Sequence, residues 1–248
     1  MMKSLLKMTW LETKLFLREP LGAFFTLAFP LMMLFLFGSI YGNKPSAMFG
    51  GYGTIDISVP AYTAMIIATT GLLSLTITVA SYRENGVLRR LRTTPVSPLA
   101  VLTAQVIVLF LMTTFGMLLL IIAGKLVYHM RFEGNLLSVL GGFVLGSLSF
   151  FGLGFILASL LRTARTAQIV GMVLLYPMLF LSGAGIPREL LPQAIRKVAS
   201  FLPLTYVVNL LRGLWIGEAW SKHWLDVGVL AGMLLLGIIV SSMTFRWE

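Results

Sequence analysis

Six long apolar runs, none of which contains a charged residue, constrain the fold of this chain more than any other feature. They are 19 to 26 residues long, and a helix of about 20 residues crosses a hydrocarbon core of about 30 Å. Apolar residues make up 58% of the 248 residues and charged residues only 11%, whereas soluble domains carry about 25% charge. The sequence therefore predicts an all-α polytopic membrane protein whose six transmembrane helices cover residues 21–41, 59–81, 99–124, 136–161, 166–186 and 227–245.

Two segments outside these runs have helical patterns of their own. In residues 1–20, apolar side chains recur at a spacing of three or four residues, namely at Leu5, Met8, Leu11 and Leu15. This spacing is typical of a helix that lies in the membrane interface. Residues 187–217 contain an uncharged run, 198–211, that includes Pro203 and is too short to cross the membrane. We therefore expect an N-terminal interfacial helix, and re-entrant helices on the extracellular side before the last span.

The distribution of basic residues sets the orientation of the six expected spans. With the N-terminus inside, eleven of the 19 Lys and Arg residues fall on the inner side, and such residues are enriched in cytoplasmic loops. All five tryptophans fall outside the expected spans, as in an aromatic belt. The first apolar run follows a charged segment and is too long for a signal peptide. We expect a multi-pass protein of the cell membrane with both termini in the cytoplasm.

Several classes of chemistry are excluded by what the sequence lacks. There is no G-x-x-x-x-G-K-[ST] phosphate loop and no cysteine, so we do not expect this chain to bind ATP or an iron–sulfur cluster. His129 and His223 have no partners at metal-ligand spacing, and we interpret both as ordinary interface residues. The net charge of +10 is attributed to loops that meet anionic lipid, not to nucleic-acid binding. We therefore predict no catalytic residue, metal or cofactor in this chain.

None of the six expected spans contains Asp, Glu, Lys, Arg or His. Carriers that are driven by a proton or sodium gradient normally need an ionisable group or a broken-helix ion site within the membrane. A secondary carrier is therefore disfavoured. The chain is expected to be the passive part of a machine whose energy source lies in another protein.

The second expected span carries a series of hydroxyl side chains. Thr70, Ser74 and Thr78 recur every four residues, and Ser81 follows three residues later. On a regular helix these residues form one polar stripe. The stripe is either the lining of a translocation path or a set of interhelical hydrogen bonds, which contribute only about 0.6 kcal/mol each.

Small residues in the fourth expected span favour close helix packing. Gly142 and Gly146 form a G-x-x-x-G pattern, which lets another helix approach closely. The partner helix lies either in the same chain or in a second copy. We favour packing within the chain because small-residue spacing is common in membrane helices.

The segment between the second and third runs, RENGVLRRLRTTPVSP at residues 83–98, is short, basic and patterned. Val87, Leu88 and Leu91 fall on one side of a possible helix that ends before Pro95, because the residue before a proline disfavours the helical conformation. The basic residues could hold lipid headgroups, but the aligned apolar residues favour contact with another protein. The expected contact residues are Arg83, Glu84, Gly86, Val87, Leu88, Leu91 and Pro95.

At this segment the sequence resembles a known family. SYRENGVLRRLRTTPVSPLAVLTAQ is similar to the first cytoplasmic loop of type-2 ATP-binding-cassette (ABC) transporter permeases, which contains their coupling helix. FLSGAGIPRELLPQAIRKVASFLPLTYVVNLLRGLWIG, at residues 180–217, resembles the segment before the last span of the same family. The resemblance covers essentially the whole chain and is closest in appearance to small bacterial drug or antibiotic exporters.

The resemblance implies roles and partners. Residues 83–95 would form the cytoplasmic coupling helix, and its Glu84, Gly86, Leu88 and Leu91 would dock into a groove on a separate ATPase subunit that holds ATP and Mg. Residues 187–217 would close the outer end of the path. Family members work as dimers of permeases with two ATPase subunits, so a second, identical or different, permease chain is implied. Many members have a second acid where this chain has Asn85.

The expected function is therefore that of the permease subunit of an ABC exporter. An uncharged lining suits a lipophilic or amphiphilic substrate, such as a drug, an antibiotic or a lipid-like molecule. The resemblance also allows a polysaccharide or a peptide as the substrate. A non-transporting sensor or assembly protein that uses residues 83–98 to bind a soluble partner is the alternative from another class.

Overall fold

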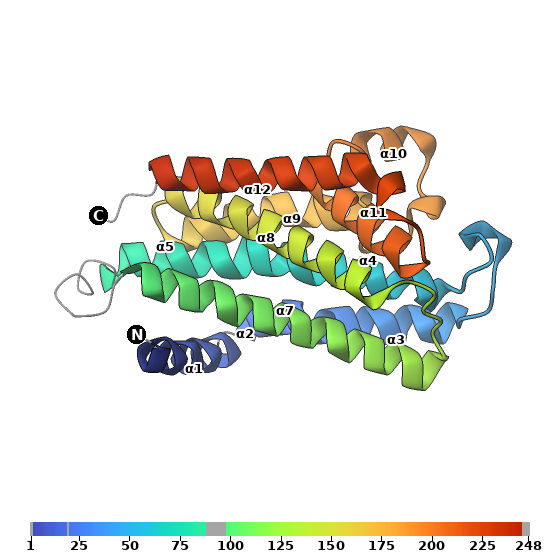
Figure 1. Cartoon of the computed structure of the whole chain (residues 1–248), viewed down its shortest axis with the longest axis horizontal. Helices are drawn as coiled ribbons and strands as arrows, with labels where there is room; N and C mark the ends of the chain where they lie inside the picture. The colour runs from blue at the N-terminus through green and yellow to red at the C-terminus, as the bar shows by residue number, and fades with distance from the viewer. Residues whose placement is uncertain (1, 19, 88–97, 245–248) are drawn as a thin grey trace.

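The protein is described by a computed structural model that covers residues 2–18, 20–87 and 98–244. Within these ranges the chain is a bundle of helices without any strand (Figure 1). The helices are α1 (Met2–Arg18), α2 (Pro20–Ala23), α3 (Phe29–Tyr41), α4 (Thr54–Thr69), α5 (Thr76–Glu84), α7 (Pro98–Tyr128), α8 (Leu136–Leu160), α9 (Ala164–Leu181), α10 (Gln193–Ala199), α11 (Pro203–Trp215) and α12 (Trp224–Thr244). Two π-helical turns, η1 (Phe24–Ala28) and η3 (Thr70–Leu75), and three 3₁₀ turns, η2 (Ala47–Phe49), η4 (Arg188–Leu190) and η5 (Trp220–His223), complete them.

Among the described residues, six helical segments are long and apolar enough to cross a membrane, which confirms the predicted all-α fold with six candidate spans. Their bounds are Phe24–Tyr41, Thr54–Glu84, Ala100–Tyr128, Leu136–Leu160, Ala164–Leu181 and Trp220–Met243. Helix α1 and the last turn of α12 lie at one end of the bundle, here called the α1 end (Figure 1). The segment around α10 lies at the opposite end, here called the α10 end (Figure 1).

The candidate spans extend beyond the uncharged runs that the sequence predicts, so ionisable residues lie at their ends, and the second helix shows this most clearly. That helix begins at Thr54, not at residue 59, so the fully buried side chain of Asp56 lies in its first turn. The predicted uncharged run starts only after Asp56. The Oδ2 atom of Asp56 nevertheless accepts a hydrogen bond from the backbone N–H of Gly53, the residue that precedes the helix, at 2.9 Å. A carboxylate that caps a helix N-terminus belongs to the helix. The last span likewise begins earlier than expected, at Trp220, and includes Lys222, His223 and Asp226.

The second span is the central element of the bundle. All of residues 53–76 are buried, and helices α3, α7, α8, α9 and α11 pack around them. A helix that is apolar all round and buried along its length is typical of the centre of a membrane bundle. Any movement of this span must therefore displace most of its neighbours.

The π turn η3 interrupts this central helix between α4 and α5. A π turn holds about one more residue than an α turn, so residues on either side of it do not keep the spacing of a regular helix. The hydroxyl of Thr76 compensates locally by donating to the carbonyl oxygens of Gly71 at 3.2 Å and of Gly154 at 3.3 Å. The hydroxyl stripe expected from a uniform helix is therefore broken at η3.

Small residues on α8 allow close packing on two sides. A Cβ atom at Gly142 would lie 2.8 Å from Leu214, and one at Gly146 would lie 3.1 Å from Val207, both on α11. On another face, a Cβ atom at Gly237 of α12 would lie only 2.6 Å from the Cα atom of Gly152. Both G-x-x-x-G residues thus face a helix of the same chain, and the α8–α12 contact is made by backbone against backbone.

The segments outside the spans pack against the bundle ends. Among the side chains of α1 that the structure describes, Glu12 and Phe16 are buried, whereas Trp10, Leu11 and Leu15 are exposed. An apolar face therefore remains free for lipid. Helices α10 and α11 meet at a bend of 100° before Pro203. A sharp bend between two short apolar helices has the form expected for a re-entrant segment.

Candidate functional site

The structure describes only the first part of the expected coupling segment. Arg83 and Glu84 end α5, Asn85 and Gly86 form a turn, and Val87 is the last residue described before residue 98. Leu88, Leu91 and Pro95 lie outside the described residues. The structure therefore shows how the coupling segment is attached to the bundle.

Arg83 attaches the end of α5 to the end of α8. Its Nη1 atom donates to the carbonyl oxygens of Ala158 at 2.6 Å and of Ser159 at 3.0 Å. The last carbonyl groups of a helix lack partners in the helix and carry a partial negative charge. A guanidinium at this position therefore satisfies two carbonyl groups and complements the dipole of α8.

Glu84 attaches the same end of α5 to the start of α9. Its Oε2 atom accepts a hydrogen bond from the backbone N–H of Ala164 at 2.8 Å. The first N–H groups of a helix carry a partial positive charge, so a carboxylate is favourable there. Arg83 and Glu84 together, here called the α5 clamp, thus bind opposite ends of two consecutive helices. Besides the docking role that the sequence predicts, both residues therefore have a role within the bundle.

Gly86 makes the turn that leads from the clamp into the coupling segment. Its φ angle is +64°, in the left-handed region, and its N–H donates to the carbonyl oxygen of Arg83 at 3.0 Å. Residues with a Cβ atom pay about 1–2 kcal/mol in this conformation. No atom of the described residues lies within 4 Å of the position of an added Cβ, so the need for glycine here is conformational.

A cavity of about 220 Å³ lies at the α1 end, next to the clamp. It is here called the α1-end cavity, and it is lined by Glu12, Leu15, Phe16, Ile77, Thr78, Ser81, Tyr82, Gln105 and Ala164. Ile77 also lines a pocket of about 50 Å³, here called the Ser74 pocket, whose other residues are Gly22, Phe25, Leu73, Ser74, Gln168 and Met172. Two members of the expected stripe, Ser74 and Thr78, thus line adjoining spaces.

Thr70 lies apart from these two residues. Its hydroxyl donates to the carbonyl oxygens of Ile66 and Ile67 at 2.9 and 3.0 Å and accepts from the hydroxyl of Thr113 at 3.2 Å. Of the three, Thr70 therefore takes the interhelical role that was the alternative to a path. Ser74, in contrast, is 1% exposed and its hydroxyl has no hydrogen-bond partner.

The α1-end cavity contains a buried acid that the sequence pattern did not reveal. Glu12 is 7% exposed, and the hydroxyl of Tyr82 donates to its carboxylate at 2.6 Å. Burial raises the pKa of Glu12, and the hydrogen bond from Tyr82 offsets part of this effect. Gln105, which is 3% exposed, has an Oε1 atom without a hydrogen-bond partner. These acceptors come from α1 and α7, about 90 residues apart in the chain.

A larger cavity of about 440 Å³ lies at the α10 end. It is bordered mainly by aromatic and apolar side chains of α3, the α3–α4 connection and α4, including Phe37, Tyr41, Met48, Phe49 and Tyr62. Ligand pockets usually have volumes of about 300–1,000 Å³ and predominantly apolar linings. This cavity is therefore large enough for an apolar compound.

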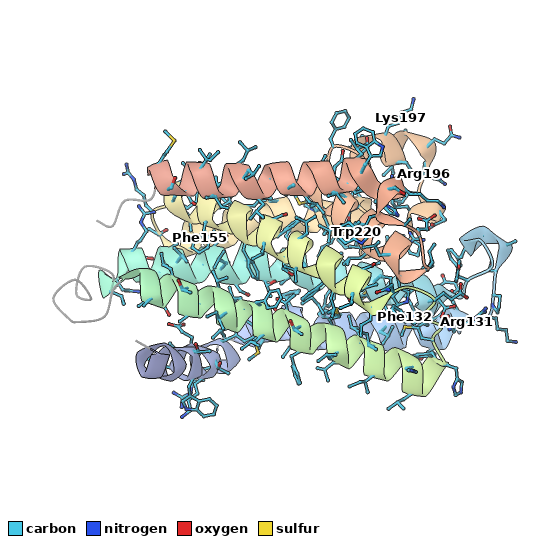
Figure 2. The ribbon with its side chains drawn as sticks, viewed as in Figure 1. Arg131, Phe132, Phe155, Arg196, Lys197 and Trp220 are labelled. Carbon is cyan, nitrogen blue, oxygen red and sulfur yellow. The ribbon has the colours of Figure 1, made fainter. Side chains whose placement is uncertain are left out.

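Asp56 fixes the loops beside this larger cavity. Its carboxylate accepts hydrogen bonds from Asn43 Nδ2 at 2.8 Å, from Arg131 N at 2.8 Å and from Gly53 N at 2.9 Å. Figure 2 shows Arg131 at the α10 end of the bundle. Because three donors from three segments meet at this carboxylate, it acts as a structural staple between the loops.

Ionic groups also join η4, α11 and α12 at the α10 end. Glu189 Oε1 lies 2.7 Å from Arg212 Nη2. Burial alone would raise the pKa of Glu189, but the charge and hydrogen bond of Arg212 outweigh it and hold the pKa below its usual value. His223, expected to be an ordinary interface residue, lies 2.9 Å from Asp226 and 3.0 Å from Glu218. Among the described residues, no group of three or more potential ligands is placed to hold a metal ion.

Comparison with known proteins finds relatives along most of the chain. A family profile described as "ABC-2 type transporter" matches residues 3–215. The probable multidrug ABC transporter permease YbhR of Escherichia coli (strain K12) is 25% identical over 171 residues, which are 67% of this chain and 46% of YbhR. Nodulation protein J of Rhizobium leguminosarum bv. viciae is 32% identical over 111 residues, 45% of this chain and 43% of that protein.

A more extended match is the putative transport permease ycf38 of Porphyra purpurea. It is 26% identical over 229 residues, which are 87% of this chain and 75% of that protein. In YbhR and Nodulation protein J, by contrast, the chain spans about half of the relative's length.

Proposed function

This chain belongs to the ABC-2 type transporter family, and we propose on that basis that it is the membrane subunit of an exporter powered by a separate ATPase subunit. The family and the six spans make it a multi-pass permease component of a membrane transporter. The ATPase partner, the direction of transport and the substrate are the proposed parts. The proposal also includes a second permease chain, identical or different, and ATP with Mg bound only in the ATPase.

The α5 clamp is the observation that carries the proposal. The coupling segment begins with Arg83 and Glu84, which end α5 and bind the end of α8 and the start of α9. A partner that displaces the coupling segment would therefore move three helices at once. The displacement would also reach the α1-end cavity, because Tyr82 and Ala164 belong to its lining. Binding energy can drive such a change only if the partner binds the two conformations with different affinity.

In this proposal the α1 end faces the cytoplasm, so that both termini lie inside the cell membrane. The basic residues that precede the first span, those of the coupling segment and those of the α8–α9 connection all belong to this side. The α10 end then faces outward, and α10 and α11 close the outer end of the path as re-entrant helices.

The proposed substrate is lipophilic or amphiphilic. The larger cavity at the α10 end has a mainly apolar lining, and two relatives carry the description "probable multidrug ABC transporter permease". The path would include the surfaces of Ser74 and Thr78. Changing both residues to Val should alter the range of transported compounds while the ATPase remains bound. Unchanged transport kinetics would restrict the two hydroxyls to packing.

The partner is tested by isolating the tagged permease from its own membranes and identifying the proteins that come with it. We expect a stoichiometric ATPase with a phosphate loop. In the double variant Leu88→Asp/Leu91→Asp the ATPase should be lost, because the apolar side of the coupling segment would carry two charges.

Met48→Asp provides the control, since Met48 is 57% exposed in the loop region at the α10 end. This variant should keep the ATPase. Size-exclusion profiles show whether each variant is folded. If wild type captures no ATPase, or if Leu88→Asp/Leu91→Asp captures as much as Met48→Asp, the proposed coupling is wrong.

A further inference from the structure

The α1-end cavity has a chemical character that the proposed transport function does not by itself require. Four helices contribute to its lining: α1, α5, α7 and the start of α9. Among the lining residues that the structure describes, one is acidic and none is basic. A cavity with this composition attracts a positively charged group and repels an anion.

Glu12 is the source of this selectivity. Its carboxylate is buried, and among the described residues it accepts a hydrogen bond from one neutral donor, the hydroxyl of Tyr82. Within the described part of the chain, no Lys, Arg or His lies within ion-pair distance of it. Buried charges are normally paired, because an unpaired one loses its hydration without compensation. A cationic ligand would supply the missing partner.

Two further acceptors lack partners in the same region. Gln105 Oε1 in the α1-end cavity and Ser74 Oγ in the adjoining pocket are both buried and without a hydrogen bond. Native proteins leave few buried polar atoms unpaired, so each of them points to a missing partner. An ammonium group has three N–H donors in different directions. It can therefore bind the carboxylate and an amide oxygen at the same time.

The size of the space limits which part of a molecule it can hold. About 220 Å³ is below the volume of usual pockets for drug-sized ligands. The lining includes Leu15, which is 45% exposed, so the cavity reaches the apolar outer face of α1. A charged head would thus fit inside while an apolar tail extends toward lipid.

We propose that the α1-end cavity binds the protonated amine of an amphiphilic substrate, with Glu12 as its counter-ion and Gln105 as a hydrogen-bond acceptor. This inference rests on the proposed function, because it assigns a substrate class to the exporter. Ser81 and Tyr82, which line the cavity, directly precede the α5 clamp in the chain. A bound amine would accordingly lie where the ATPase acts on the bundle.

The proposal is tested by binding to the full-length permease in nanodiscs of zwitterionic phosphatidylcholine, with empty nanodiscs as the blank. Dansylcadaverine is the probe, since it joins a protonated primary amine to a fluorescent apolar group. N-pentyl dansylamide is the matched neutral probe. Glu12→Gln keeps an acceptor for Tyr82 and should weaken dansylcadaverine binding at least tenfold, with little effect on the neutral probe. Gln105→Leu should weaken dansylcadaverine binding by a smaller factor than Glu12→Gln does.

Lys14→Gln is the control variant, because Lys14 is exposed on the same helix, and it should bind both probes as wild type does. Glu12→Asp should restore part of the affinity for the amine. The proposal is overturned if Glu12→Gln binds dansylcadaverine as wild type does, or if it weakens both probes equally, which a purely structural role would produce. If the proposed exporter function is wrong, this would be seen in a separate experiment, as the absence of an ATPase from the isolated permease.

Discussion

Replacing Asp56 with Asn provides a sharp test of how the α10 end is held together. The two residues have nearly the same shape, so the substitution changes hydrogen bonding and charge without creating a cavity. An Asn oxygen can still accept from Asn43 Nδ2 and Arg131 N, which share Oδ1 in the wild type. The amide NH₂ group would then replace Oδ2 and face the N–H of Gly53, which donates to that atom at 2.9 Å.

The magnitude follows from these contacts. Losing a charge-assisted hydrogen bond and leaving the buried donor of Gly53 unpaired costs about 1.5–3 kcal/mol. Losing the negative charge at the start of α4 costs about 1 kcal/mol more. The total of about 3 kcal/mol corresponds to a decrease in Tm of about 6–12 °C for a protein of this size.

Thermal unfolding followed by tryptophan fluorescence at a fixed scan rate measures this decrease. Trp215 is a local reporter, since its Nε1 atom donates to the carbonyl oxygen of Arg131 at 3.3 Å. Glu133→Gln is the matched control because Glu133 is an exposed acid that accepts one hydrogen bond, from Tyr52 at 2.9 Å. Exposed pairs contribute less than about 1 kcal/mol, so its Tm should fall by less than about 4 °C. Equal Tm values for the two variants would refute the role assigned to Asp56.

Three further predictions concern other parts of the molecule. Gly86→Ala should introduce about 1–2 kcal/mol of backbone strain where φ is +64°; it should reduce substrate-stimulated ATPase activity of the complex, whereas Gly86→Asn should largely retain it. Gly237→Ala should destabilise the protein by about 1–3 kcal/mol, because its Cβ would lie 2.6 Å from the Cα atom of Gly152; in the same thermal assay Gly232→Ala, where no atom lies within 4 Å, should have no such effect. Because the pKa of Glu189 is lowered, its ion pair with Arg212 stabilises the fold fully at pH values above 4.5, the usual pKa. This stabilisation is lost as the pH falls through the lowered pKa. Hydrogen exchange in residues 187–217 should therefore accelerate on acidification below pH 4.5 in wild type but not in Glu189→Gln. Equal acceleration in both would contradict the role assigned to the Glu189–Arg212 ion pair.

The sequence was sufficient for features that depend on local composition. Uncharged length determined the six spans, because the hydrocarbon core excludes charge and requires about 20 apolar residues. The short run around Pro203 indicated a segment that does not cross, and α10 and α11 meet there at a 100° bend. Gly142 and Gly146 indicated close packing, and both residues face α11.

The features that the sequence did not reveal depend on contacts between distant residues or on irregular backbone. The contact of Glu12 with Tyr82 joins residues separated by 70 positions. Asp56 lies before the predicted run 59–81, because the uncharged pattern starts only after it. Its role at the start of α4 depends on a contact with the backbone N–H of Gly53, which the pattern does not show. The stripe of Thr70, Ser74 and Thr78 was drawn on a regular helix, whereas the π turn from Thr70 to Leu75 shifts the later residues.

The α5 clamp has a mechanical consequence. Because Arg83 binds carbonyl groups at the end of α8 and Glu84 binds an amide at the start of α9, the three helix ends form a stiff joint rather than a loose hinge. A force applied beyond Gly86 would be transmitted as a torque on the whole group of helices. Bending at the joint would first have to separate both charges from their helix ends. The α8–α9 connection would thereby move with the rest without needing any contact of its own with the source of the force.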